Sequence, residues 1–317
     1  MVSELLTKDP APASPPRLGR HVRDLAVVSS KVVAFNVTYL AGVWAVIIAA
    51  VTLAALRPTW WTLALAFVVV SGRQQALLNV EHECIHGIFL KGRNANERVA
   101  VALCASPVGS PYNTSKARHL AHHRTLAQPE DPDHDLHAGP DKSTRGGVLR
   151  HFALGLLGGY ALRILLGRHG GDGPAVVSRR DTLRDLRNLV IGQATLFAAA
   201  ALLLEWWVYP VLWAAPLGTL TAFCHLVRSF GEHALVADEE AGHANRLITV
   251  RSNRVERFLV APYNMNYHSE HHLFPWIPAS RLPEAQRRLH DAPEAPPRLV
   301  RSSYAQALGS YFRSLAA

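Results

Sequence analysis

The stretch NVEHECIHGIFL, residues 79–90, places two histidines one helical turn apart. Its centre, His82-Glu83-Cys84-Ile85-His86, matches the pattern H-E-x-x-H. On a helix this pattern puts two imidazoles on one face with a carboxylate beside them, and it is typical of zinc proteases, in which the glutamate is the general base. Because a single pair at this spacing is usually two ordinary histidines, the rest of the chain must decide its meaning.

Two further histidine clusters have the spacing H-x-x-H-H. They are HLAHH, residues 119–123, and HSEHH, residues 268–272. Positions i, i+3 and i+4 lie on one face of a helix, so each cluster presents three imidazoles in one direction. The three clusters together supply His82, His86, His119, His122, His123, His268, His271 and His272.

These eight imidazoles are too many for one metal ion. A catalytic zinc site uses three protein ligands and keeps a fourth position open. The number and duplication of the clusters therefore favour two metal ions. Imidazole binds Zn, Cu, Fe and Ni, so the ligand type alone does not identify the metal. The histidines without this spacing are predicted to be solvated or structural: His21, His134, His137, His151, His169, His243 and His290.

Composition indicates a membrane protein with a large water-facing part. Charged residues make up 18% of the 317 residues, below the quarter or so that is usual in soluble proteins. The mean hydropathy is only +0.07, so a substantial polar region must accompany any membrane spans. The net charge of +9 suits an anionic lipid surface or an acidic protein partner. No nucleic-acid-binding motif is present, and we expect no nucleic-acid partner.

Hydropathy predicts four membrane spans in two hairpins. Residues 32–56 carry no charge and are long enough to cross a hydrocarbon core of about 30 Å. Residues 60–80 return as a weaker span, and residues 188–207 and 209–227 form the second hairpin. The apolar stretches 98–112 and 148–167 are short or flanked by charge, so we expect interfacial helices there rather than spans.

The distribution of basic residues predicts the orientation. Basic residues gather before each hairpin, at Arg17, Arg20, Arg23 and Lys31 and again at Arg179, Arg180, Arg184 and Arg187. The two opposite turns hold only Arg57 and Glu205. The positive-inside rule then places both termini and the histidine clusters in the cytoplasm.

The expected fold is therefore an all-α integral membrane protein of the cytoplasmic membrane. Four transmembrane helices in two hairpins would support a cytoplasmic helical cap that carries the metal site. Residues 1–31 would form a cytoplasmic tail with an amphipathic segment, residues 32–290 the membrane domain, and residues 291–317 a cytoplasmic C-terminal tail.

With their flanking residues, the three clusters resemble the histidine boxes of the membrane fatty acid desaturases and their hydroxylase relatives. The matching segments are HECIHGIFL, ARHLAHHRTLAQPEDPD and NMNYHSEHHLFPWIPASRLPEAQRRL. The resemblance extends from about residue 35 to residue 290, including the paired-hairpin topology. It implies a site of two Fe²⁺ ions with O2 as co-substrate.

The resemblance also implies a ninth histidine ligand at the cytoplasmic end of the fourth span. His233 is the predicted ligand, because it lies beyond Arg228 and outside the apolar run. His225 lies about 12 Å deeper along the helix axis and is predicted to pack between helices or to line a substrate tunnel, as is Tyr267.

Several polar residues near the boxes are predicted to support the ligands. A carboxylate beside a ligating histidine can accept its second N–H and fix the ring. The predicted supporting residues are Glu83, Glu232, Glu270 and Asn264. Asp131 and Asp133 could orient ligands in the same way, but the default expectation is that they are solvated charges in a charge-rich loop.

The resemblance implies an O2-dependent desaturase that introduces a double bond into the acyl chain of a lipid or an acyl thioester. Electrons would come from an external donor such as ferredoxin with its reductase. The first alternative is a hydroxylase or ketolase of the same superfamily that acts on a lipid or terpenoid. An intramembrane zinc protease would leave both H-x-x-H-H clusters unused, and a metal carrier would predict more polar residues in the spans.

Overall fold

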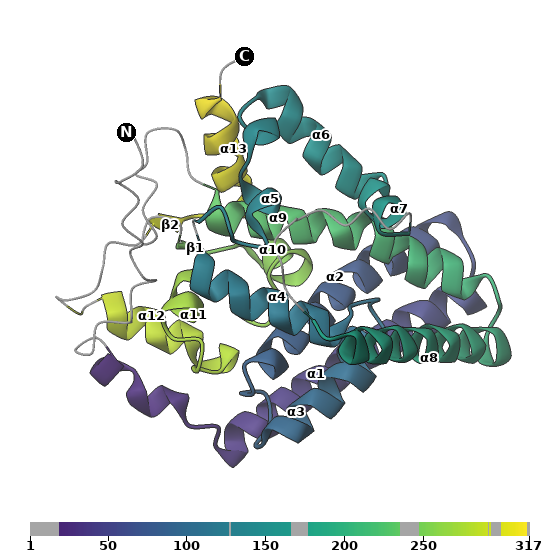
Figure 1. Ribbon diagram of the computed structural model, residues 1–317. Coiled ribbons are helices and arrows are strands. Elements are labelled where there is room, and N and C mark those ends of the chain that lie inside the picture. Colours follow the sequence, from purple (N-terminus) through teal and green to yellow (C-terminus); the bar gives the residue numbers. More distant parts are fainter. Residues whose placement is uncertain are drawn as a thin grey trace.

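The computed structural model describes residues 19–126, 128–165, 177–234, 247–290, 292 and 299–315. The predictions made for residues 1–18, His169 and His243 lie outside these residues. The structure is mostly helical, as expected (Figure 1). One departure from the all-α prediction is a short parallel sheet, in which β1 (Ile248–Val250) pairs with β2 (Leu299–Arg301). Its first strand is a buried β-branched run, ITV, which favours extended backbone.

Within the described residues, four helical segments are long and apolar enough to cross a membrane. They are α1 (Ser30–Leu56), α2 (Trp60–Ile85), α8 (Arg179–Leu203) and the segment Pro210–His233. The last contains the π-helical segments η5 (Pro210–Ala214) and η6 (Leu217–Thr221), followed by α9 (Ala222–His233). All four are longer than predicted. The main extensions are at the start of α8, which begins at Arg179 rather than residue 188, at the end of α2, which continues to Ile85 rather than residue 80, and at the end of α9, which continues to His233 rather than residue 227.

Side-chain caps explain where three of these helices begin. Ser29 accepts a hydrogen bond from the Val32 N–H before α1, and Ser178 accepts one from the Asp181 N–H before α8. Before α2, Thr59 and Thr62 form a reciprocal capping box. Each cap satisfies backbone donors that the first helical turn leaves unpaired. The cap at Ser178 lets α8 include a charged first turn, which a span predicted from hydropathy omits.

The polar residues in the middle of α2 face the fourth span and α10 (Arg254–Leu259). Gln74 donates a hydrogen bond to the Trp213 carbonyl and accepts one from Thr221. Arg73 donates to the Phe258 carbonyl, and its guanidinium lies 4.0 Å from the centre of the Phe258 ring. These partners explain how α2 can be a weak span by hydropathy and still be a buried helix.

The outer faces of the long helices are apolar and uncovered by protein. No residue in the most apolar window of α8 is buried, and Val190, Ile191 and Phe197 are all exposed there. On α1, Ile48 and Leu53 are similarly exposed. An apolar surface of this extent is expected to face lipid rather than water.

The remaining helices are short, and two of them, α4 and α11, hold the two H-x-x-H-H clusters. Figure 1 shows α1, α2 and α8 on one side of the molecule and α5, α11, α12 and α13 on the other. The short elements are α3 (Arg93–Val99), η3 (Ala100–Ala105), α4 (Tyr112–Thr125), α5 (His134–His137), α6 (Arg145–Leu156), α7 (Gly159–Leu165), α11 (His268–Leu273), α12 (Leu282–His290) and α13 (Tyr304–Ser314). The first segment predicted to be interfacial corresponds to α3 and η3, and η3 packs on α2. The second corresponds to α6 and α7, and α6 packs on α9.

Candidate metal centre

Four helices bring the predicted ligands together. The end of α2 supplies His82 and His86, and α4 supplies the cluster at 119–123. The last residue of α9 is His233, and α11 supplies the cluster at 268–272. Because each cluster lies within a single helix, its spacing determines where its imidazoles point.

Five imidazoles form one group, called here the five-histidine group. It consists of His82, His86, His119, His123 and His271, whose ligand atoms all lie within 4.8 Å of one another. The Nε2 atoms of His86 and His119 are 2.8 Å apart, and those of His119 and His123 are 3.0 Å apart. His271 Nε2 lies 3.1 Å from His123 Nε2. The ring nitrogens therefore converge on a common point.

A second set, the four-histidine group, consists of His122, His233, His268 and His272. His268 Nε2 lies 2.9 Å from the Nε2 atoms of both His233 and His272. His233, the predicted ninth ligand, thus joins this group. His225 belongs to neither group.

Each H-x-x-H-H cluster is divided between the two groups in the same way. In α4 the i and i+4 residues, His119 and His123, join the five-histidine group, whereas His122 joins the other. In α11 the i and i+4 residues, His268 and His272, join the four-histidine group, whereas His271 joins the first. Residues i and i+4 lie above one another on a helix, so they point to the same side. The two clusters therefore face each other, and each gives two imidazoles to one group and its third imidazole to the other group.

This arrangement fits metal ions. Two nitrogens that are each about 2.1 Å from one ion, at about 90° to each other, lie about 3.0 Å apart, close to the separations seen here. Burial lowers the pKa of His119, His271 and His272, which keeps these imidazoles in the neutral form that binds metal. Both ring nitrogens of His82 are buried without a hydrogen-bond partner among the described residues, which also fits a ligand.

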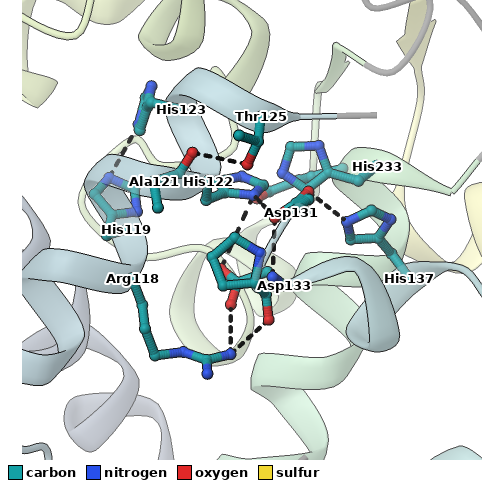
Figure 2. A network of polar contacts seen from close by, with 12 residues as sticks. Arg118, His119, Ala121, His122, His123, Thr125, Asp131, Asp133, His137 and His233 are labelled. Carbon is teal, nitrogen blue, oxygen red and sulfur yellow. Dashed lines mark hydrogen bonds and ion pairs between the residues drawn. The ribbon is translucent and has the colours of Figure 1, made fainter. Parts of the chain in front are cut away.

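Asp131 connects the metal centre to a histidine outside both groups (Figure 2). Its Oδ1 lies 2.9 Å from His122 Nδ1, and its Oδ2 lies 3.6 Å from His137 Nε2. Burial opposes the charged state of Asp131, but the hydrogen bond with His122 and the close contact with His137 outweigh it and hold the pKa of the carboxyl below its usual value. Burial alone would lower the pKa of His122, yet the bond to Asp131 and the charge of Asp133 raise it.

The sequence interpretation gave the wrong default for Asp131 and assigned no role to His137. Both side chains are buried, although Asp131 was expected to be solvated. The available signal was the acidic segment that follows the second box, but sequence spacing does not show which of its carboxylates turns inward. Asp133 behaves closer to expectation, because its side chain is partly exposed and pairs with Arg118 at 3.2 Å.

Glu232 contacts a predicted ligand, His268, although its neighbour in the sequence is His233. Its Oε2 is 3.2 Å from His268 Nδ1. Its Oε1 accepts hydrogen bonds from Tyr304 at 2.6 Å and from Arg228 at 3.2 Å. Arg228 in turn donates to Asn79 of α2. These contacts fix the carboxylate where it can orient the His268 ring.

The other predicted supporting residues have different surroundings. Glu83 Oε2 accepts a hydrogen bond from the Ala279 N–H, and its Oε1 is buried without a partner among the described residues. Glu270 accepts a hydrogen bond from Thr249. Asn264 lies in a turn with φ of 59° and donates to the Ala279 carbonyl. Their support of the ligands stays a prediction.

A cavity of about 280 Å³ touches both histidine groups. His82 and His119 line it from the five-histidine group, and His122, His233 and His268 line it from the other. His225 also lines this cavity, and its place near a substrate stays a prediction. Tyr267, the other tunnel candidate, is absent from this lining and packs against the hydrophobic core.

Comparison with known proteins identifies the family. A sequence profile described as "Fatty acid desaturase" matches residues 58–304. A dihydrorhizobitoxine desaturase from Bradyrhizobium elkanii is 25% identical over 265 residues, which cover 80% of this chain and 75% of that protein. A beta-carotene ketolase from Paracoccus sp. (strain N81106 / MBIC 01143) is 24% identical over 218 residues, which cover 67% of this chain and 74% of that protein. The profile match spans most of the chain and all three histidine boxes, and this chain therefore belongs to the fatty acid desaturase family.

Proposed function

We propose that this protein is an O2-dependent desaturase of the membrane that uses two iron ions, one held by the five-histidine group and one by the four-histidine group. The observation that carries the proposal is the convergence of nine imidazoles from four helices into two adjacent groups. Family membership supports a redox reaction at this site rather than proteolysis or metal carriage.

The proposed reaction removes two hydrogens from neighbouring carbons. Two C–H bonds break, a C=C bond forms, and O2 is reduced to two molecules of water. The substrate supplies two electrons and two protons, and an external donor supplies the other two electrons, with two protons from solvent. Bound iron would supply the reduction of O2 that makes removal of hydrogen from an unactivated carbon possible.

The protein's own residues would position this chemistry. Asp131 holds the His122 ring by its Nδ1, and Glu232 lies where it can hold the His268 ring in the same way. Both contacts leave Nε2 directed at the metal centre. The cavity that touches both groups gives a substrate carbon access to the site, and the surrounding helices limit the entry of water.

The proposed location is a multi-pass position in the cytoplasmic membrane, with the four spans arranged as two hairpins. Both termini and the metal site would lie on the cytoplasmic side, since the arginines before α1 and α8 favour that side. Residues 1–31 and 291–317 would be cytoplasmic tails on either side of the membrane domain at 32–290. The net charge of +9 supports an acidic electron donor such as ferredoxin, served by its reductase.

A ketolase or hydroxylase is the second candidate, because one relative is named beta-carotene ketolase. Transfer of one oxygen atom to carbon in place of loss of the second hydrogen would give an alcohol and one water. A second oxygenation and loss of water would give a ketone. Small differences in substrate position decide between these outcomes.

Mass spectrometry of a strain with and without this protein tests the proposal. Cells are grown under ¹⁸O2, and all extracted compounds are compared. A desaturase gives products two hydrogens lighter that carry no ¹⁸O, whereas a hydroxylase or ketolase gives products that carry ¹⁸O. His268→Ala should abolish either product. Products that form equally without O2 would contradict both candidates.

A further inference from the structure

Most side chains that line the cavity at the histidine groups carry a polar group, even where the predicted histidine ligands are set aside. Among its lining residues only Leu78, Ile85 and Leu136 are apolar. The other lining side chains are hydroxyl, charged or imidazole groups, and Glu81 and Ser110 are among them. A plain hydrocarbon segment would give no hydrogen bond to any group of this wall that lacks a partner within the protein.

Glu81 is the most informative of these side chains. It lies on α2 directly before His82, is 3% exposed, and belongs to neither histidine group. Ser110 Oγ donates a hydrogen bond to Glu81 Oε1 at 2.7 Å, and Ser115 Oγ lies 2.9 Å from Ser110 Oγ. The second carboxyl oxygen, Oε2, has no hydrogen-bond partner among the described residues. A buried carboxyl with a free acceptor beside a cavity is suited to a substrate that donates a hydrogen bond.

A second cavity provides the contrast. It has a volume of about 350 Å³ and lies between α1, α8 and the start of the fourth span. Its lining is almost wholly apolar and includes Trp44, Ile47, Leu196 and Leu212. No histidine of either group lines it. The space suited to an alkyl chain is thus separate from the space that reaches the metal centre.

We infer that the substrate presents to the metal centre a carbon close to a hydroxyl or amine group, which donates a hydrogen bond to Glu81 Oε2. Ser110 and Ser115 hold the carboxyl in position from the other side. The substrate class is therefore a polar molecule, or the polar head of an amphiphile, rather than the middle of a long unsubstituted acyl chain. This inference rests on the proposed O2-dependent oxidation.

The test compares wild-type protein with Glu81→Gln and with the control Glu97→Gln, whose side chain is exposed on α3. Each protein is expressed in cells, and extracts are separated into water-soluble and lipid fractions before mass spectrometry. We expect an O2-dependent product in which the oxidised carbon lies within about three bonds of a hydroxyl or amine. The fraction that contains it distinguishes a free polar molecule from a lipid headgroup. Glu81→Gln should lower the yield at least tenfold with iron content unchanged, and Glu97→Gln should match wild type.

Ser110→Ala keeps the test decisive if Glu81→Gln does not accumulate. It removes one hydroxyl that positions Glu81 and should lower the yield at least threefold with iron content unchanged. A product oxidised in the middle of a long acyl chain, with full yield from Glu81→Gln or Ser110→Ala, would overturn this inference and leave the proposed function intact. An iron-loaded protein without an O2-dependent product in either fraction would instead overturn the proposed function.

Discussion

Asp131 shows how one residue ties the metal centre to the surrounding helices. Its carboxylate contacts His122 of α4 and His137 of α5, and all three side chains are buried (Figure 2). A carboxylate that accepts the second N–H of a ligand fixes the ring and increases its basicity. Asp131 would therefore act on a bound metal ion through His122.

Replacement of Asp131 by Asn should weaken iron binding at the four-histidine group. We expect a loss of about 10- to 100-fold in affinity, because the amide cannot replace the charged acceptor. Anaerobic titration of metal-free protein with Fe²⁺ measures this. Asp135→Asn is the control, since that side chain is 66% exposed, and it should bind as wild type does. Equal affinities for the two variants would contradict the role given to Asp131.

His233 and His225 lie on the same helix and should respond differently to substitution. His233→Ala removes a member of the four-histidine group, so it should abolish turnover and lower the iron content. His225→Ala changes only the cavity wall, so it should keep iron and at most alter rate or product. Metal analysis and product analysis of both variants provide the comparison. The assignment is reversed if His225→Ala loses iron and His233→Ala keeps both iron and activity.

At this scale the sequence predicts which histidines belong to the site but not how they are shared. The spacing i, i+3, i+4 is local, so it indicates that each cluster faces the site, but it does not show that the i+3 imidazole joins a different group from the other two. The exchange of His122 and His271 between the groups depends on how α4 and α11 approach each other. That approach is a tertiary property with no signal in either helix. Burial of Asp131 has the same origin, because distant segments cover its loop.

The contact between α2 and α10 is a close approach at the scale of elements, and it involves backbone on both sides. A Cβ atom at Gly72 would lie 2.8 Å from both the ring and the backbone carbonyl of Phe258. The backbone there cannot rotate away as a flexible side chain would, so the two helices would have to separate. The same contact carries the hydrogen bond and the cation–π interaction of Arg73.

Gly72→Ala should therefore destabilise the protein by about 1–3 kcal/mol, the usual cost of overpacking. Gly42→Ala is the matched control, since it lies in α1 and a Cβ there meets no atom within 4 Å. We expect the control to be neutral or slightly stabilising, because Ala is the better helix former. Thermal unfolding in detergent gives both values. Equal midpoints for the two variants would show that α2 and α10 are not in close contact.

Element boundaries show what hydropathy can and cannot predict. Hydropathy places the start of the second hairpin at residue 188, where the uncharged run begins. The helix α8 instead begins at Arg179, because Ser178 caps it and its charged first turn can extend into water. The π-helical segments at Pro210–Ala214 and Leu217–Thr221 follow from prolines 210 and 216, which lack the N–H that a regular helix needs. Their effect on the direction of α9 is visible only in the folded chain.

At the scale of the whole molecule, the proposed orientation can be tested by labelling. The native cysteines, Cys84, Cys104 and Cys224, are buried, so the background should be low. Single cysteines introduced at Arg57 and Glu205, which are exposed in the two turns, should react with a membrane-impermeant maleimide from outside the cell. Cysteines at Arg150 and Arg254 should react only after the membrane is opened. Efficient labelling of Arg150→Cys in intact cells would reverse the topology.

Iron content is the most direct test of the central claim. Protein purified without O2 is analysed for metals, together with His86→Ala from the five-histidine group and His268→Ala from the four-histidine group. The account predicts about two irons per chain in the wild-type protein and about one in each variant, since each substitution damages one group. One zinc per chain and no iron, with activity restored by zinc alone, would contradict it.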